Sequence, residues 1–180
     1  MGVQFSTITE TDRPRIYVAC LAAYNNGRLH GAWIDAARDA WELWDDIRAM
    51  LLASPVMDAE EFAIHDYEGF GGVRIAESEG IDRVAEIAAF IVEHGALGAA
   101  VLDHCADDLD EAREAITGRY LGMHASLADY VQELTEECMT IPEQLSGYID
   151  WQAMAHDAEV GGDVFVIETG YQQAHVFAGR

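Results

Sequence analysis

The sequence holds 180 residues, of which 51% are apolar, and it carries 33 Asp and Glu against ten basic residues, giving a net charge of −23. This length suits one compact unit or two to three small ones, and the apolar content excludes a chain that is disordered by composition. The charge excludes nucleic acid and anionic membranes as partners, because both would be repelled. It favours protein partners that carry basic grooves.

The sequence shows no segment that predicts membrane insertion or secretion. No uninterrupted apolar run reaches the roughly 18–20 residues of a membrane span. The first fifteen residues lack a basic stretch followed by an apolar block, so we expect a cytoplasmic protein. The cysteines Cys20, Cys105 and Cys138 are too few and too scattered for a disulfide framework or a zinc site, and we interpret them as small buried or half-buried thiols.

Three blocks follow one another along the chain. Residues 1–75 are predicted to mix strands over 15–23, 29–34 and 61–66 with a helix over 35–53. Asn25, Asn26 and Gly27 indicate the turn of a hairpin, because Asn and Gly tolerate positive φ. Pro55 limits the helix, since a proline disfavours helical backbone just before it.

The second and third blocks complete a fold of the α+β class. Residues 76–117 are predicted to be helical, with Ser78 as a helix N-cap, Gly95 as a stop, and short helices over 97–105 and 107–117. Residues 118–180 are predicted to mix short strands over 164–168 and 174–178 with a helix over 126–138, capped by Ser126, and a short helix or turn over 148–157. The net charges of the three blocks are −6, −9 and −8, so the acidity is not confined to a tail.

The acidic residues recur at helical spacing. Within residues 35–53, four carboxylates would form one stripe on a helix: Asp35, Asp39, Glu42 and Asp46. Trp33, Trp41 and Trp44 would lie on the opposite, core-facing side. Like charges four residues apart cost a helix roughly 0.2–0.5 kcal/mol per pair, so a role other than helix stability is indicated.

Similar stripes are predicted in the other two blocks. We interpret all of them as partner-binding surfaces that imitate a row of phosphates. The remaining members are Glu79, Asp82, Glu86 and Glu93, then Asp107, Asp110 and Glu114, and finally Asp129, Glu133 and Glu136. Carboxylates at this spacing stand roughly 5.5 Å apart along a helix, against about 3.4 Å for the phosphates of one DNA strand. Two adjacent stripes therefore approach the charge density of a duplex.

Catalytic and metal-binding interpretations have little motif support. His65-Asp66 and His156-Asp157 each place a possible base beside a carboxylate, but no nucleophile motif accompanies them. Asp103-His104-Cys105 matches no zinc spacing, and residues 107–111 lack the glycine and register of a calcium loop. We expect no catalytic residues, no metal and no cofactor. Adaptation of the surface to salt is an alternative source of the acidity.

Three segments together resemble the ArdA family of antirestriction proteins. The resemblance covers the chain from about Arg15 to Phe177, with one departure at His156, where the family pattern usually has Arg. The matching segments are Ile16-Tyr17-Val18-Ala19 with Tyr24-Asn25-x-Gly27-x-Leu29-x-Gly31-Ala32-Trp33, then Glu61-Phe62-Ala63-Ile64-His65-Asp66-Tyr67-Glu68, and Ile141-Pro142-x-x-Leu145-x-x-Tyr148-Ile149-Asp150-Trp151-x-Ala153-x-Ala155-His156-Asp157.

This resemblance implies an elongated, curved homodimer of chains with three small domains, here 1–75, 76–117 and 118–180. Such a protein would mimic bent B-form DNA and occupy the DNA-binding groove of type I restriction–modification enzymes, blocking restriction and modification. It would be carried by a mobile genetic element. Two rivals remain: an acidic adaptor that inhibits another DNA-binding protein, and a hydrolase using one of the His-Asp pairs.

Overall fold

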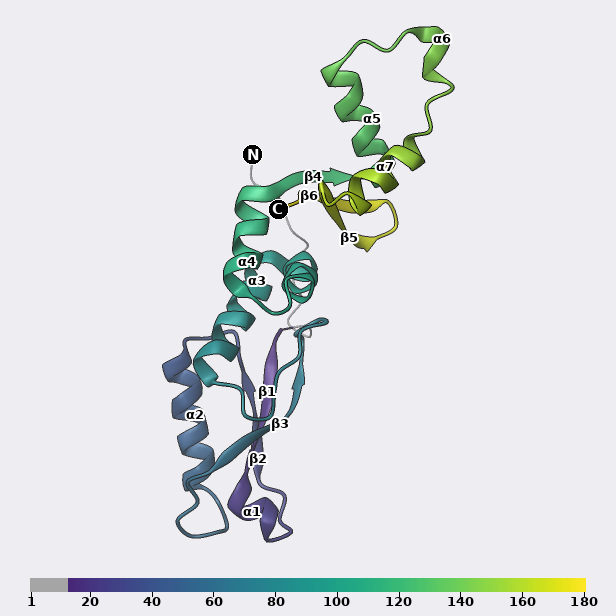
Figure 1. The fold of residues 1–180 in the computed structure, drawn as a ribbon. Helices are drawn as coiled ribbons and strands as arrows, with labels where there is room; N and C mark the ends of the chain where they lie inside the picture. Colours follow the sequence, from purple (N-terminus) through teal and green to yellow (C-terminus); the bar gives the residue numbers. More distant parts are fainter. Residues whose placement is uncertain (1–12) are drawn as a thin grey trace. The chain divides into compact units, whose positions relative to one another are not determined.

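The computed structural model describes residues 13–180 and has the predicted α+β composition. The chain divides into two compact units, one reaching to Leu109 and the other comprising Asp110–Arg180. The predicted division into three domains stays a prediction. Each unit contains one three-stranded antiparallel sheet with helices (Figure 1).

The first unit is built on the sheet β2-β1-β3, with β1 in the centre. Val18, fully buried on β1, pairs with Ala32 of β2 and with Ile64 of β3. The sheet packs against α2 through buried residues such as Leu43 and Ile47. The elements of this unit are β1 (Arg15–Cys20), α1 (Leu21–Asn25), β2 (Gly31–Asp35), α2 (Ala40–Leu52), β3 (Phe62–Glu68) and α3 (Ile81–His104).

The predicted hairpin between the first two strands is present, with a longer connection than expected. A short helix, α1, follows β1 directly, because the Cys20 side chain accepts a hydrogen bond from the Ala23 N–H and caps it. Gly27 then reverses the chain with φ of 70°. Glycine suits this conformation, since other residues rarely adopt positive φ.

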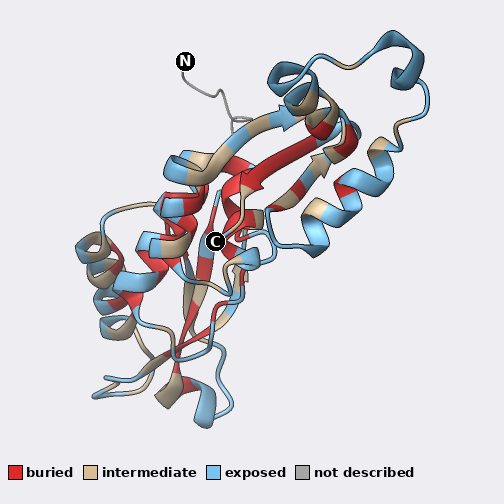
Figure 2. Cartoon of the chain, turned by 45° about the horizontal axis from the view of Figure 1, so that its top comes forward, coloured by how far each residue is buried: buried red, intermediate tan, exposed pale blue. Residues whose placement is uncertain are grey.

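Helix α3 contains the break that the sequence predicted at Gly95. This residue has φ of 64° and ψ of −151°, so two helical segments meet there at a kink. The N-cap is Gly80, and the prediction of Ser78 as the cap was wrong. Val84, Ile87 and Leu102 are among the fully buried residues of this helix. Figure 2 colours the chain by burial and shows helices with both buried and exposed parts.

By length and composition alone, α3 is long and apolar enough to cross a membrane. Its most apolar 18-residue stretch has a mean hydropathy of 1.6, and 61% of that stretch is buried inside the fold. The core helix of a soluble protein passes the same test, so this feature is weak evidence for a membrane. Five charged residues interrupt the apolar sequence of this helix: Asp82, Arg83, Glu86, Glu93 and Asp103.

The second unit is built on the sheet β4-β6-β5, in which β6 is central and buried from Ala174 to Phe177. Strand β4 was not predicted, since its exposed Leu121 and Met123 and its Gly122 do not form a typical strand pattern. The elements are α4 (Leu109–Glu114), the π-helical turn η2 (Ala115–Arg119), β4 (Tyr120–His124), α5 (Leu127–Cys138), α6 (Glu143–Ser146), α7 (Trp151–Val160), β5 (Val164–Gly170) and β6 (Gln173–Ala178).

Helices α5 and α7 share a small core of their own. Ala128 and Val131 of α5 are buried with Ala155 of α7, and partly buried aromatic residues pack around them. The predicted cap of α5 is confirmed, because the Ser126 side chain accepts a hydrogen bond from the Asp129 N–H. Cys138, at the end of α5, is exposed, so the prediction that all three cysteines are at least half buried was wrong for this one.

Candidate partner-binding surface

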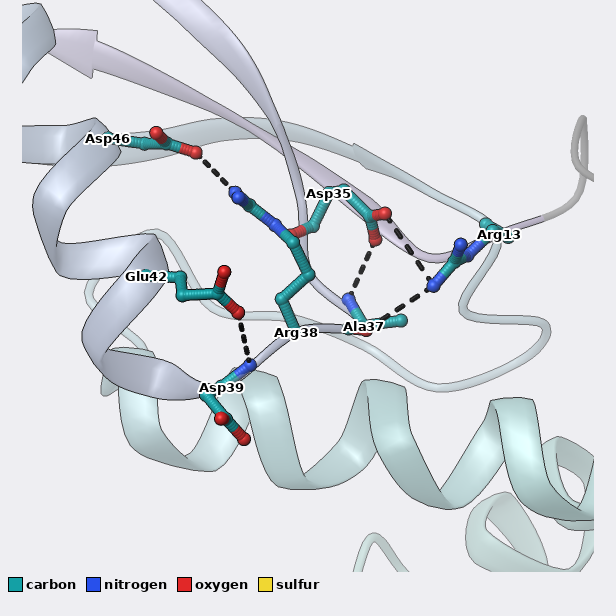
Figure 3. Close-up of polar contacts among 7 residues, drawn as sticks. All are labelled: Arg13, Asp35, Ala37, Arg38, Asp39, Glu42 and Asp46. Carbon is teal, nitrogen blue, oxygen red and sulfur yellow. Dashed lines mark hydrogen bonds and ion pairs between the residues drawn. The ribbon is translucent and has the colours of Figure 1, made fainter.

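The first predicted stripe is not a stripe on one helix. Helix α2 begins at Ala40, and Asp35 lies at the end of strand β2. The Asp35 carboxylate accepts a hydrogen bond from the Ala37 N–H at 2.9 Å and lies 3.7 Å from the Arg13 guanidinium (Figure 3). The sequence placed Asp35 and Asp39 on the helix because acidic residues are found both in the turn before a helix and in its first turn. The spacing of the carboxylates therefore did not reveal where the helix begins.

The remaining members of this stripe also have structural roles. Glu42 accepts a hydrogen bond from the Asp39 N–H at 3.3 Å, and the two residues form a capping box at the start of α2. Asp46 bonds Arg38, and this hydrogen bond raises the pKa of the guanidinium (Figure 3). Arg13 and Arg38 therefore offset part of the negative charge of the first stripe.

The tryptophans of this segment are also less buried than predicted. Trp41 is 64% exposed and Trp33 is 40% exposed, so the prediction that both face a core was wrong. Trp44 is half-buried, and its ring meets Phe62 edge to face at 5.6 Å. Trp41 lies in the first turn of α2, where its Nε1 donates a hydrogen bond to the Asp39 carboxylate at 3.3 Å.

The second stripe is largely present on α3. Asp82, Glu86 and Glu93 are exposed and share one face of that helix, because they are four and eleven residues apart. Glu79 precedes the helix, and its partly buried carboxylate pairs with Arg83 at 3.5 Å. Three of the four predicted residues thus remain available on one surface of the first unit.

The third stripe is broken in the structure. Asp107 precedes α4 with φ of 64°, and its carbonyl accepts a hydrogen bond from Arg83 at 2.6 Å. Asp110 and Glu114 are exposed on α4, and Asp110 forms an ion pair with Arg113 at 3.5 Å. Only these two carboxylates share a helix face.

The fourth stripe has the predicted geometry. Asp129, Glu133 and Glu136 are all exposed on one face of α5. Glu133 lies 3.0 Å from the His124 Nδ1, and Glu136 accepts a hydrogen bond from Gln132 at 2.8 Å. These partners are Ser126, His124 and Gln132, and none is an arginine, so no permanent cation among them cancels the charge of this surface.

A broader feature of the second unit was missed, although the sequence displays it. From Tyr120 to Gly179 there are ten carboxylates and neither lysine nor arginine. The arginines that flank this segment are both engaged by Glu111: Arg119 bonds it, and Arg180 lies 2.9 Å away. The bond from Arg180, with that from Arg119, lowers the pKa of Glu111. A scan for the longest interval without a basic residue would have found this segment.

The two His-Asp pairs do not assemble into catalytic dyads. His65 and Asp66 are neighbours on β3, where successive side chains point to opposite faces. The His65 imidazole lies 3.5 Å from Glu77 and contacts the Tyr24 ring edge to face. His156 and Asp157 are both exposed on α7. Within residues 13–180, no three His, Cys, Asp or Glu side chains converge in a group that could hold a metal.

A family model described as antirestriction protein (ArdA) matches residues 16–173, nearly the whole chain. The chain belongs to this family. The resemblance predicted from the three sequence segments is thereby confirmed, and membership in ArdA implies an antirestriction function through interaction with restriction–modification enzymes. A comparison with curated proteins finds no significant match.

Proposed function

We propose that this ArdA protein mimics bent B-form DNA and occupies the DNA-binding groove of type I restriction–modification enzymes, blocking restriction and modification. The observation that supports this most directly is the segment Tyr120–Gly179, with ten carboxylates and no lysine or arginine. Such a surface offers negative charge that no internal cation neutralises.

The physical basis is competition for the same cationic side chains. A DNA-binding groove contains Lys and Arg that neutralise phosphates and release counterions when DNA binds. Carboxylates held on a helix such as α5 can take these contacts, and they present no base for methylation or cleavage. Inhibition of this kind is largely independent of DNA sequence, because phosphate contacts position a protein and base contacts specify a site.

The structure changes which carboxylates we assign to this role. The first stripe contributes less than the sequence indicated, because Asp35, Glu42 and Asp46 bond groups within the first unit. The main contributors are the exposed carboxylates of α3 and α5 and the arginine-free segment around α5, α6 and α7. The role is distributed, so single substitutions have small effects.

The deciding experiment is competition for a type I methyltransferase core. Labelled DNA is bound to the core, and this protein is titrated at low and moderate salt. Displacement near stoichiometry, weakening as salt rises, supports the proposal, because screening reduces attraction between exposed charges. If a folded protein displaces no DNA from the core but inhibits an unrelated DNA-binding protein, it is instead an acidic adaptor.

We further propose that the protein acts as a homodimer in the cytoplasm. A dimer doubles the length of acidic surface available to one groove. Sedimentation equilibrium tests this: a mass near twice 19.8 kDa at micromolar concentration is expected. A monomer that still displaces DNA would contradict the dimer and leave the mimic intact.

A further inference from the structure

A cavity of about 470 Å³ lies between the outer edge of β2 and helix α2, wholly within the first unit. This volume falls in the range of ligand-binding clefts, about 300–1,000 Å³. Figure 1 shows β2 and α2 as neighbouring elements of this unit. The cavity is lined from the strand by Gly31, Trp33 and Ile34, and from the helix by Asp46, Ala49 and Met50.

The backbone of β2 faces this cavity with groups that can pair with another strand. β2 is an edge strand, paired on its other side with β1. At the two ends of β2, the Ala36 N–H donates to the Pro14 carbonyl and the His30 carbonyl accepts from the Cys20 N–H. The even-numbered residues of β2 are therefore the ones whose backbone groups bond β1. In an antiparallel pair the intervening residues direct their N–H and C=O groups away from the partner. Gly31, Trp33 and Asp35 therefore direct theirs outward, and the Asp35 carbonyl accepts a bond from Arg38 there.

The walls of the cavity suit the side chains of an added strand. Ala49 on α2 and Ala53, the C-cap of that helix, are small side chains one turn apart in the lining of the cavity, together with the buried Met50 and Ile34. Trp33 stands beside the edge, held by the Tyr17 ring at 5.6 Å and the Arg15 guanidinium at 4.8 Å. An extended peptide can thus bury one set of side chains against α2 while its main chain extends the sheet.

We propose that this groove binds an extended, basic segment of a partner protein by adding a strand to β2. The segment would alternate apolar and basic residues. Charge selects this occupant, because residues 1–109 carry twenty carboxylates against seven arginines, and Asp46, which lines the groove, stays partly exposed beside Arg38. A second copy would bring a further net charge of −23. The residues before Arg13 carry Glu10 and Asp12 and no basic residue. This inference is independent of DNA mimicry.

The test uses the full-length ¹⁵N-labelled protein and a hexapeptide that alternates arginine and valine. At saturation, the amide signals of Gly31 and Trp33 shift, and hydrogen exchange of these two amides slows by about tenfold or more, the equivalent of 1.4 kcal/mol. Filling the cavity with Ala49→Leu weakens binding by about tenfold or more. The matched control Ala89→Leu changes another exposed alanine, on α3, and leaves binding unchanged.

The second probe is a hexapeptide with three arginines followed by three valines, which has the same charge. If it protects Gly31 and Trp33 equally, attraction of charge explains the binding and strand addition is wrong. Unchanged signals at both amides, or equal binding by Ala49→Leu, also overturn the proposal. If protection instead rises with protein concentration in the absence of peptide, a second copy is the occupant and the basic-partner proposal fails.

Discussion

Arg38 and Asp46 bond across eight residues and tie the turn before α2 to the body of that helix. Arg38 also donates to the Asp35 carbonyl at 3.2 Å, so one guanidinium joins the end of β2 to α2. Both side chains of the pair are partly exposed. A carboxylate that the sequence presents as part of a binding stripe thus helps to hold the first unit together.

Replacing Arg38→Gln removes the ion pair with Asp46 and should lower the free energy of unfolding of the first unit. The loss should be only about 0.5–1 kcal/mol, because solvent screens exposed ion pairs. Urea denaturation measures this, and a double-mutant cycle with Asp46→Asn isolates the coupling of the pair. Inhibition of restriction should persist in both variants. A complete loss of inhibition by a folded Asp46→Asn protein would show that this carboxylate contacts the enzyme directly.

Neutralising α5 should weaken inhibition more than neutralising the first stripe. The triple variant Asp129→Asn, Glu133→Gln, Glu136→Gln keeps the hydrogen-bond acceptors but removes three exposed charges. At about 0.2–1 kcal/mol per exposed contact, its affinity for the methyltransferase core should fall roughly threefold to a hundredfold.

The matched control is Asp35→Asn, Glu42→Gln, Asp46→Asn. It should lose stability in urea and less affinity in the competition assay, because those carboxylates bond groups within the first unit. Equal losses of affinity in the two triple variants would contradict our division of the acidic residues into binding and structural sets.

His175 should make the second unit less stable in mild acid. Its ring is buried on β6 between the Tyr120 hydroxyl at 2.9 Å and the Thr169 hydroxyl at 3.0 Å, and burial lowers its pKa below the ordinary 6.5. The unfolded chain therefore binds a proton more readily than the folded one. The stability contributed by the neutral ring is complete above pH about 6.5 and is lost as pH falls below that value toward the folded pKa.

Urea denaturation near pH 7.5 and pH 5.5, followed by the amide signals of β6, measures this contribution. The variant His175→Gln should be less stable at the higher pH but should lose less on acidification than the parent. His156→Gln, which changes an exposed histidine, serves as control and should follow the parent. An identical acid response in His175→Gln would show that other groups cause it.

Gly95→Ala should destabilise the first unit, although the same change inside a regular helix stabilises by about 0.5–1 kcal/mol. Gly95 has φ of 64° and ψ of −151°, a region essentially restricted to glycine, and forcing alanine into it costs about 1–3 kcal/mol. The urea midpoint gives the sign. Ala96→Gly is the neighbouring control, with an expected loss of about 1 kcal/mol. A stabilised Gly95→Ala protein would show that α3 is continuous in solution.

The sequence by itself determined the family, the acidity and most of the element order, because these depend on local pattern. The Ser126 cap, the Gly95 break and the first three strands follow from residue types whose backbone preferences act within a few positions. The stripe on α5 was predicted correctly for the same reason, since it lies wholly inside one helix.

Only the tertiary structure decided which carboxylates are structural and which are free to meet a partner. Asp35 is bonded through a turn, Asp46 through an arginine eight residues earlier, and Glu111 through Arg180 at the other end of the unit. The position of β2 at an edge of its sheet, beside α2, likewise follows from the strand order β2-β1-β3, which the sequence did not show. Periodicity records which residues share a face, but pairing across a fold is set by distances that the linear sequence does not contain.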